Sequence, residues 1–187
     1  MLETHNIVQV IRSGNFVVLD TETTGLNRWD EICQIAVVNS HGHVLMDTYV
    51  KPAKPIPADA TRIHGITNDM VMSAPNFAGV VTNLVGLLSG MNVIVYNALY
   101  DRKMLHQSAD AIGLAKTDWR TLSRWWCAME TFAEIYGEWN SYHQSYKWQT
   151  LSTASRYYNP PVIDAHSALG DCQMTLAVCR AMAEAVK

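Results

Sequence analysis

The order of apolar runs along the chain is the feature that most constrains its fold. Three β-type runs come first, at 16–19, 32–38 and 43–50, and a short turn at 40–42 joins the last two as a hairpin. Strand and helix patterns then alternate, with strands expected at 93–96 and 124–129 and helices at 75–88, 101–111 and 147–158. Hairpin strands followed by such alternation predict a mixed sheet with helices packed on it, a single α/β domain over residues 1–187.

The last segment carries the clearest helical pattern. Leu169, Cys172, Leu176, Cys179 and Ala183 recur at spacings of three and four, which places them on one apolar face of a helix. No run approaches the roughly 18 apolar residues that a membrane span needs, and the first residues lack the basic start and apolar run of a signal peptide. We therefore expect a cytoplasmic protein with no membrane partner.

The overall charge limits the way in which this chain can bind nucleic acid. Fourteen Lys and Arg residues stand against 17 Asp and Glu residues, a net charge of -3. Proteins that bind nucleic acid usually carry a basic surface. If this chain binds nucleic acid, the contact must be short, locally charged, or carried by bound metal ions.

Two carboxylates follow the first apolar run directly. Asp20 and Glu22 are two residues apart, so on a strand their side chains share a face, about 6.6 Å apart along the backbone. Like charges on one face repel unless a cation lies between them. The pair therefore indicates a cation site, although Asp20 could also begin a turn while Glu22 is solvated.

Two further acidic positions stand near expected helix starts. Asn97 is a plausible N-cap, and Asp101 falls in the first turns of the following helix, where the helix dipole favours acidic residues in any case. If His166 and Asp171 serve one site, His166 should lie in the loop before the last helix and Asp171 in its first turns, because residues five apart diverge by about 140° within a helix. A lone histidine can equally be a solvent-facing or capping residue.

Taken together, the four carboxylates and the histidine predict metal-dependent phosphodiester chemistry. Hard oxygen ligands suit Mg²⁺ or Mn²⁺, and the chain has no Cys/His cluster of the kind that binds zinc. Two such ions, about 3.5–4 Å apart, can clamp a phosphodiester for in-line attack by water. A histidine with a pKa near 6.5 can take the proton of that water near neutral pH.

At this point the sequence resembles a known family. Its segments are DTETTGL at 20–26, YNALYD at 96–101 and HSALGD at 166–171, with IHGIT at 63–67. They are similar to the motifs of the DEDDh (DnaQ-like) 3′→5′ exonucleases, notably the exonuclease domain of the DNA polymerase III epsilon proofreading subunit. The similarity spans residues 16–171. It implies a ribonuclease H-like fold, a mixed five-stranded sheet flanked by helices, which agrees with the pattern described above.

The resemblance also implies a role for each matching residue. Asp20, Glu22 and Asp171 would hold two Mg²⁺ ions, for which Mn²⁺ would substitute, and Asp101 would complete the metal site by acting on the attacking water. His166 would be the general base. The expected substrate-binding residues are Thr23, Thr24, Gly25, Leu26, Trp29, His64 and Asn97.

The expected substrate-binding residues differ in the role predicted for each. The resemblance implies that Thr23 and Glu22 hold the terminal hydroxyl and that Leu26 wedges against the terminal bases. Trp29 follows the first motif closely and is a candidate for base stacking. His64 can be a structural turn residue or a substrate contact.

These features predict a metal-dependent 3′→5′ exonuclease that releases nucleoside 5′-monophosphates from single-stranded DNA ends. The same chemistry on RNA, as in ribonuclease T or an oligoribonuclease, is the first alternative, and no residue reveals how the 2′-hydroxyl is treated. An inactive module that docks on a polymerase and a hydrolase of free nucleotides also stay open. The expected partner is a nucleic-acid 3′ end. The sequence does not decide whether a polymerase or another protein binds as well.

Overall fold

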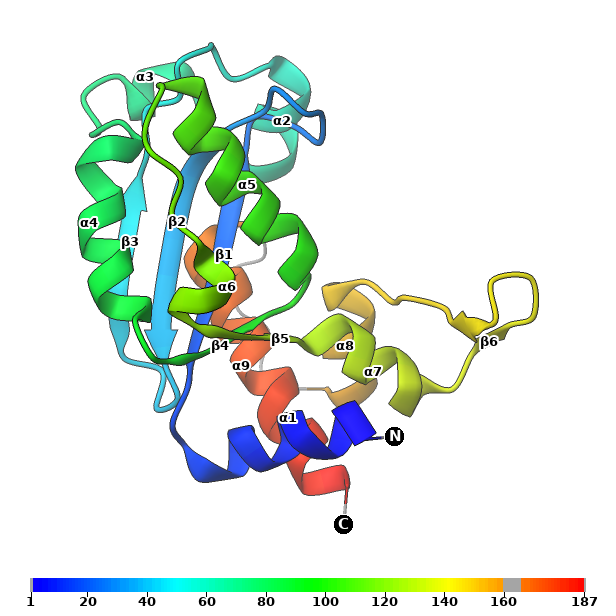
Figure 1. Ribbon diagram of the computed structural model, residues 1–187. Helices are drawn as coiled ribbons and strands as arrows, with labels where there is room; N and C mark the ends of the chain where they lie inside the picture. The colour runs from blue at the N-terminus through cyan, green and yellow to red at the C-terminus, as the bar shows by residue number, and fades with distance from the viewer. Residues whose placement is uncertain (1, 160–165, 187) are drawn as a thin grey trace.

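A central five-stranded sheet organises the computed structural model of the protein, which describes residues 2–159 and 166–186 (Figure 1). The strands are β1 (Val17–Thr23), β2 (Ile32–Asn39), β3 (Val44–Tyr49), β4 (Asn92–Val95) and β5 (Arg124–Cys127), in the order β3-β2-β1-β4-β5. The first three pair antiparallel, whereas β4 runs parallel to β1 and β5 parallel to β4. The predicted mixed sheet is confirmed, with β1 at its centre.

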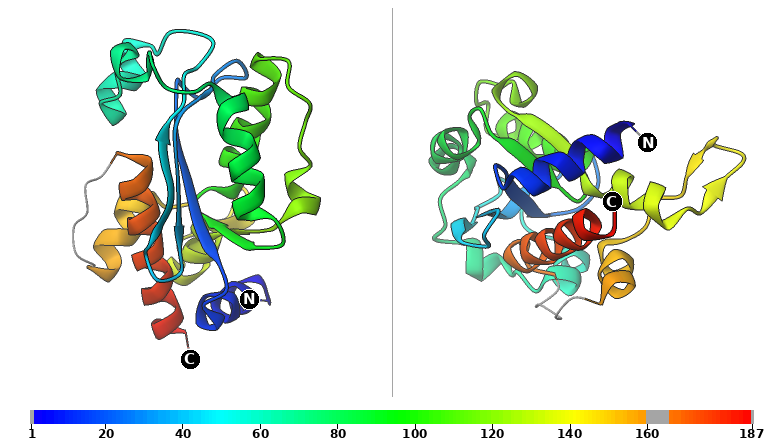
Figure 2. Two further views of the ribbon diagram at one scale, coloured as in Figure 1. Left: turned by 90° about the vertical axis from the view of Figure 1, so that its left-hand side faces the viewer. Right: turned by 90° about the horizontal axis from the view of Figure 1, so that it is seen from below.

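Alternation along β1 sends its side chains into two separate apolar layers. Val17 and Leu19 pack against α4 (Phe77–Leu88) and α5 (Ala98–Ala111), together with the short α6 (Trp119–Leu122). Phe16 and Val18 pack into the opposite layer, with α1 (Leu2–Ser13), α7 (Ala128–Tyr136), α8 (Leu151–Tyr158) and α9 (Ala168–Ala185). Figure 2 shows the sheet edge-on with these helices on its two sides. By the same alternation, residues 20 and 22 face the layer that contains α9.

Two smaller parts extend from the sheet. The helices α2 (Ala58–His64) and α3 (Asn68–Val71) follow the proline-containing connection after β3 and cover a small cluster around Cys33. A narrow arm, β6 (Trp139–Asn140) and β7 (Ser145–Tyr146), projects away from the sheet between α7 and α8 (Figure 1). The part that bears on the site is α2, because it stands beside the end of β1.

Several element boundaries differ from those the sequence predicted. The first strand does not end at Asp20 but continues to Thr23, because Thr21 and Thr23 are buried and β-branched residues suit a strand. The helix expected over 147–158 begins only at Leu151, where Thr150 is the N-cap and accepts a hydrogen bond from the Thr153 main-chain nitrogen. The predicted strand at 124–129 ends at Cys127, and α5 begins at Ala98, because Asn97 is its N-cap.

No structure was predicted for the first 15 residues, and Leu2–Ser13 within them form α1. Ile7, Val8 and Ile11 are buried in the same layer as α9. The Arg12 guanidinium donates to the carbonyl oxygen of Ala183 at 2.7 Å and to that of Val186, and so caps the end of α9. Across the described part of the chain, no helix has the length and apolarity to cross a membrane.

Candidate active site

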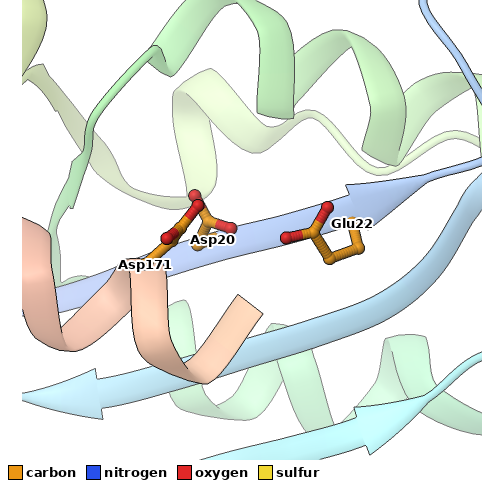
Figure 3. Close-up of side chains that lie close together, drawn as sticks. All are labelled: Asp20, Glu22 and Asp171. Atoms are coloured by element: carbon orange, nitrogen blue, oxygen red, sulfur yellow. The ribbon is translucent and has the colours of Figure 1, made fainter. Parts of the chain in front are cut away.

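Three carboxylates converge at the middle of the sheet. Asp20 and Glu22 stand opposite Ala36 and Gln34 of β2 and point toward α9. Asp171 lies in the first turn of α9, where it meets them (Figure 3). One oxygen from each of the three carboxylates lies within 4.8 Å of the other two. Glu22 and Asp171 are 149 residues apart in sequence, so the fold alone creates this cluster.

The start of α9 is fixed by capping. The Ser167 side chain accepts a hydrogen bond from the Gly170 main-chain nitrogen at 3.1 Å, which makes Ser167 the N-cap. The Gln34 side chain accepts a further hydrogen bond from the Ala168 main-chain nitrogen at 3.1 Å. These contacts tie the first turn of α9 to β2 and thereby set the position of Asp171.

Asp101 reaches the cluster from the other side of β1. The ladder between β1 and β4 pairs Val17 and Val18, and α5 begins just after β4. Asp101 is 3% exposed and accepts a hydrogen bond from the Thr21 hydroxyl at 2.8 Å. Asp101 is not one of the three carboxylates whose oxygens lie within 4.8 Å of one another. Its charge nevertheless raises the pKa values of Asp20 and Glu22. It is therefore a near neighbour of the other three.

The pKa values of these carboxyl groups show that their charges are uncompensated. Burial, followed by the charges of Asp101, Asp171 and Glu22, raises the pKa of Asp20 well above its ordinary value. Burial, then Asp171 and Asp101, raises the pKa of Glu22 to about 7, and burial raises that of Asp101 to about 7. An oxygen-only cluster that is destabilised by its own negative charge fits a divalent cation such as Mg²⁺.

His166 lies just before α9, where the sequence predicted it. Its main-chain nitrogen donates to Asp171 Oδ1 at 3.4 Å, and its backbone has a φ of 72°. The His166 residue is exposed. Burial raises the pKa of Asp171, while the hydrogen bond from the His166 main-chain nitrogen, followed by the charge of His166, lowers it. An exposed imidazole beside the carboxylates is accessible to water and to a proton.

A hollow of about 500 Å³ adjoins the cluster and shares Glu22 with it. This is within the roughly 300–1,000 Å³ of small-molecule sites. We call it the terminal hollow. Its walls come from the end of β1, the following loop, α2 and α5, and include Thr23, Gly25, Leu26, Ile63, His64 and Tyr100.

The expected substrate contacts occupy different places around this hollow. Leu26 is 77% exposed at its rim. His64 Nδ1 accepts from the Ile66 main-chain nitrogen, so its Nε2 carries the proton and donates to the Thr23 carbonyl oxygen at 3.2 Å. His64 is therefore both a wall of the hollow and a structural tie between α2 and β1.

Other predicted contacts are engaged within the protein or stand apart. Thr24 is buried and its hydroxyl donates to Asp30 Oδ1 at 2.9 Å. The Asn97 side chain accepts from the Tyr100 main-chain nitrogen at 3.3 Å. Trp29 does not line the terminal hollow, although it belongs to the same loop as Leu26.

Two residues of the site were missed by the assignment of roles from sequence. Tyr100 lines the terminal hollow, and its hydroxyl lies 2.7 Å from the Thr23 hydroxyl and donates to the Gly25 carbonyl oxygen at 3.0 Å. Its position one residue before Asp101 was the available signal. Thr21 holds Asp101 from between the two strand carboxylates, and nothing in its sequence context distinguishes it from an ordinary strand threonine.

Comparison with known proteins gives a consistent family. The model of the RNase T family, described as exonuclease, matches residues 17–179. An uncharacterized exonuclease, CP81, of Escherichia phage 186 is 40% identical over 171 residues, which cover 90% of this chain and 88% of the phage protein. A DNA polymerase III subunit epsilon-like protein of Rhodobacter capsulatus is 43% identical over 106 residues, 52% of this chain but 15% of that protein.

Solved structures share the fold. Exonuclease X in complex with 5′ overhanging duplex DNA superposes with a TM-score of 0.67 at 24% identity, covering 91% of this chain and 92% of that one. A product-bound exonuclease I superposes with a TM-score of 0.71 at 18% identity, covering 90% of this chain and 43% of that one. The family match, the phage relative and the sheet therefore agree: the chain belongs to the RNase T exonuclease family, whose members include DnaQ-like exonucleases.

Proposed function

We propose that the protein is a metal-dependent 3′→5′ exodeoxyribonuclease that releases nucleoside 5′-monophosphates from single-stranded DNA ends. The observation that carries the proposal is the junction at Glu22, where the cluster of Asp20, Glu22 and Asp171 opens into the terminal hollow. A hollow of small-molecule size beside a cation site favours cleavage of the bond next to a strand terminus.

In this proposal, each residue of the site has a separate role. Asp20, Glu22 and Asp171 would hold two Mg²⁺ ions, with Asp101 completing the site, and such ions would supply charge neutralisation and activation of water there. Thr23 and Glu22 bind the terminal 3′-hydroxyl, and Leu26 contacts the terminal base. Water attacks the phosphorus, the bond from phosphorus to the 3′-oxygen of the preceding nucleotide breaks, and His166 takes the water's proton.

Relatives support DNA as the substrate. Exonuclease X was solved in complex with 5′ overhanging duplex DNA, and exonuclease I with a dA16 oligonucleotide. We extend DNA binding to this chain on that likeness. A polymerase partner stays a prediction, because the chain covers only 15% of the Rhodobacter protein and 43% of the Buchnera aphidicola DNA polymerase III subunit epsilon. The assignment of residues 1–187 to a single exonuclease domain in the cytoplasm also stays a prediction.

The test is a time course on matched 5′-labelled single-stranded DNA and RNA oligonucleotides with Mg²⁺, with and without chelator. A metal-dependent ladder that shortens from the 3′ end, faster for DNA, is the expected result. Asp20→Ala should abolish it without unfolding the protein, whereas Asp69→Ala, at an exposed site on α3, should not. Faster cleavage of RNA would make the protein an exoribonuclease, and no cleavage of either strand would refute the proposal.

A further inference from the structure

A polar hollow lies at the end of the sheet opposite the candidate active site. The strands β1, β4 and β5 run parallel, and Asp20 lies beyond Val18, the last residue of β1 that pairs with β4, toward the carboxyl ends of these strands. The hollow, of about 460 Å³, instead adjoins the first residues of β4 and β5 and the end of α6, and it shares no lining residue with the terminal hollow. We call it the basic hollow, and its walls include Gly90, Asn92, Arg120, Thr121, Ser123 and Arg124.

The basic hollow carries positive charge that no carboxylate compensates. Arg120 and Arg124 are exposed, and within the described ranges neither forms an ion pair. Among the described residues that line the hollow, none is acidic. Asp118, the acidic residue closest in sequence to Arg120, caps α6 instead, because its Oδ1 accepts from the main-chain nitrogens of Arg120 and Thr121 at 3.1 and 3.3 Å. The two guanidinium groups are therefore available to an anion.

One buried hydroxyl of the basic hollow lacks a partner. Ser123 is 6% exposed, and its Oγ forms no hydrogen bond within the part of the chain that the structure describes. A buried polar group without a partner destabilises a fold, so its presence calls for an explanation. The Thr121 hydroxyl, by contrast, donates to the Asp118 carbonyl oxygen at 3.1 Å. Because Ser123 lines the hollow, rotation about its one side-chain torsion can turn the hydroxyl toward a ligand there.

The backbone that carries Ser123 and Arg124 is fixed on both sides. The Gly90 main-chain nitrogen donates to the Leu122 carbonyl oxygen at 2.9 Å, and the Arg124 main-chain nitrogen donates to the Met91 carbonyl oxygen at 3.0 Å. These two hydrogen bonds join the segment before β5 to the start of β4. Binding a ligand here therefore needs little ordering of the backbone, which lowers its entropy cost.

This set of groups fits a phosphate. Each arginine offers N–H donors in a planar fork that suits oxyanions, and the serine hydroxyl adds one further donor. A terminal phosphate presents three oxygens to such donors, whereas a carboxylate presents two. The volume of about 460 Å³ lies within the roughly 300–1,000 Å³ of small-molecule sites, so it also leaves room for a nucleoside that carries the phosphate.

We propose that Arg120, Arg124 and Ser123 bind a phosphate group in the basic hollow, at a site separate from the carboxylate cluster. The phosphate can belong to a free nucleotide or to the backbone of a nucleic-acid strand, because the contacts are the same for both. The arginines themselves supply the positive charge, so binding here needs no divalent cation. The site does not depend on the proposed function, and a protein that cleaves no DNA can still possess it.

Amide NMR spectra of the full chain test this site in the presence of chelator and at constant ionic strength. Inorganic phosphate, deoxyadenosine monophosphate and a short oligothymidylate are titrated separately. The expected result is a saturable shift of the amide signals of residues 90–92 and 120–124, unchanged in Asp20→Asn. Shifts with either of the first two ligands identify a free phosphate as the source, and shifts with the oligothymidylate alone identify a strand. Either result supports the site.

Variants connect the shifts to the three side chains. Arg120→Ala and Arg124→Ala should each weaken binding about 10-fold, the usual effect of losing a hydrogen bond to a charged group. Ser123→Ala should weaken it about 5-fold without lowering resistance to urea, because the hydroxyl it removes has no partner in the protein. Arg156→Ala, at an exposed arginine of α8 outside the hollow, is the matched control and should bind like the wild type. Absence of these shifts with all three ligands, or shifts that persist in the Arg120→Ala/Arg124→Ala double variant, would overturn the proposal.

Discussion

Replacing Glu22 by glutamine should stabilise the metal-free protein, and only at high pH. Burial and the neighbouring Asp171 and Asp101 raise the pKa of Glu22 from its ordinary 4.5 to about 7. The folded state therefore binds this proton more tightly than the unfolded state does. The resulting loss of stability is absent below pH 4.5, grows as the pH rises, and is complete above pH 7.

The magnitude follows from the two pKa values. Each pKa unit is worth about 1.4 kcal/mol, so the ionised Glu22 costs about 3 kcal/mol at pH 8 and about 0.2 kcal/mol at pH 4. Glutamine has the same shape and no charge to desolvate. The free energy of unfolding of Glu22→Gln relative to wild type should therefore rise by about 3 kcal/mol between pH 4 and pH 8 in the presence of chelator.

Urea unfolding followed by tryptophan fluorescence measures this difference. Glu130→Gln, the same change at an exposed glutamate on α7, is the matched control and should show no such rise. At pH 8, adding Mg²⁺ should raise the free energy of unfolding of the wild type more than that of Glu22→Gln, because the variant has one carboxylate ligand fewer. A stability gain equal at pH 4 and pH 8 would refute the idea that Glu22 is strained by burial among like charges.

Three further variants test separate parts of the structure. His166→Ala should slow cleavage by about 10²–10⁴-fold, the usual contribution of a general base, and a rate unchanged from pH 6 to 9 would remove His166 from the mechanism. Gly25→Ala should reduce cleavage by displacing the loop between β1 and β2. Gly25 has a φ of 154°, and an added Cβ would lie 2.7 Å from Asp30 Oδ2. Full activity of this variant would contradict the prediction. Phe132→Ala should lower the free energy of unfolding by about 3–5 kcal/mol, since its buried ring packs on Tyr136, Tyr157 and Tyr158, and chemical denaturation measures the loss.

The sequence predicted the sheet well because each strand carries its own apolar pattern. The runs that became β2 and β4 were located within one residue at their boundaries, and the last helix within a few residues. The first helix was missed although Ile7, Val8 and Ile11 share a buried face, and it is packing against α9 that buries them. Local pattern does not contain that long-range contact.

The proximity of the predicted carboxylates could be foreseen better than the geometry of their surroundings. Same-face spacing brought Asp20 and Glu22 together, and the need for a loop before α9 placed His166 correctly. The separation of Leu26 from Trp29 could not be foreseen, because it depends on contacts of their loop with distant segments. Gln107 of α5 donates to the Asn27 carbonyl oxygen, and Glu31 of the loop accepts from the Ala53 main-chain nitrogen in the β3–α2 connection. Those contacts join residues 22 to 80 positions apart.

The two halves of β1 are held differently, and this has a consequence for motion at the site. Val17 and Val18 are paired with both β2 and β4, whereas the pairing of Asp20 and Glu22 comes from β2 alone. Amide hydrogens in the first half should therefore exchange with solvent more slowly than those around the carboxylates. The strand is therefore held on both sides at its base and on one side around Asp20 and Glu22, so that the end carrying the two carboxylates is the part that can move.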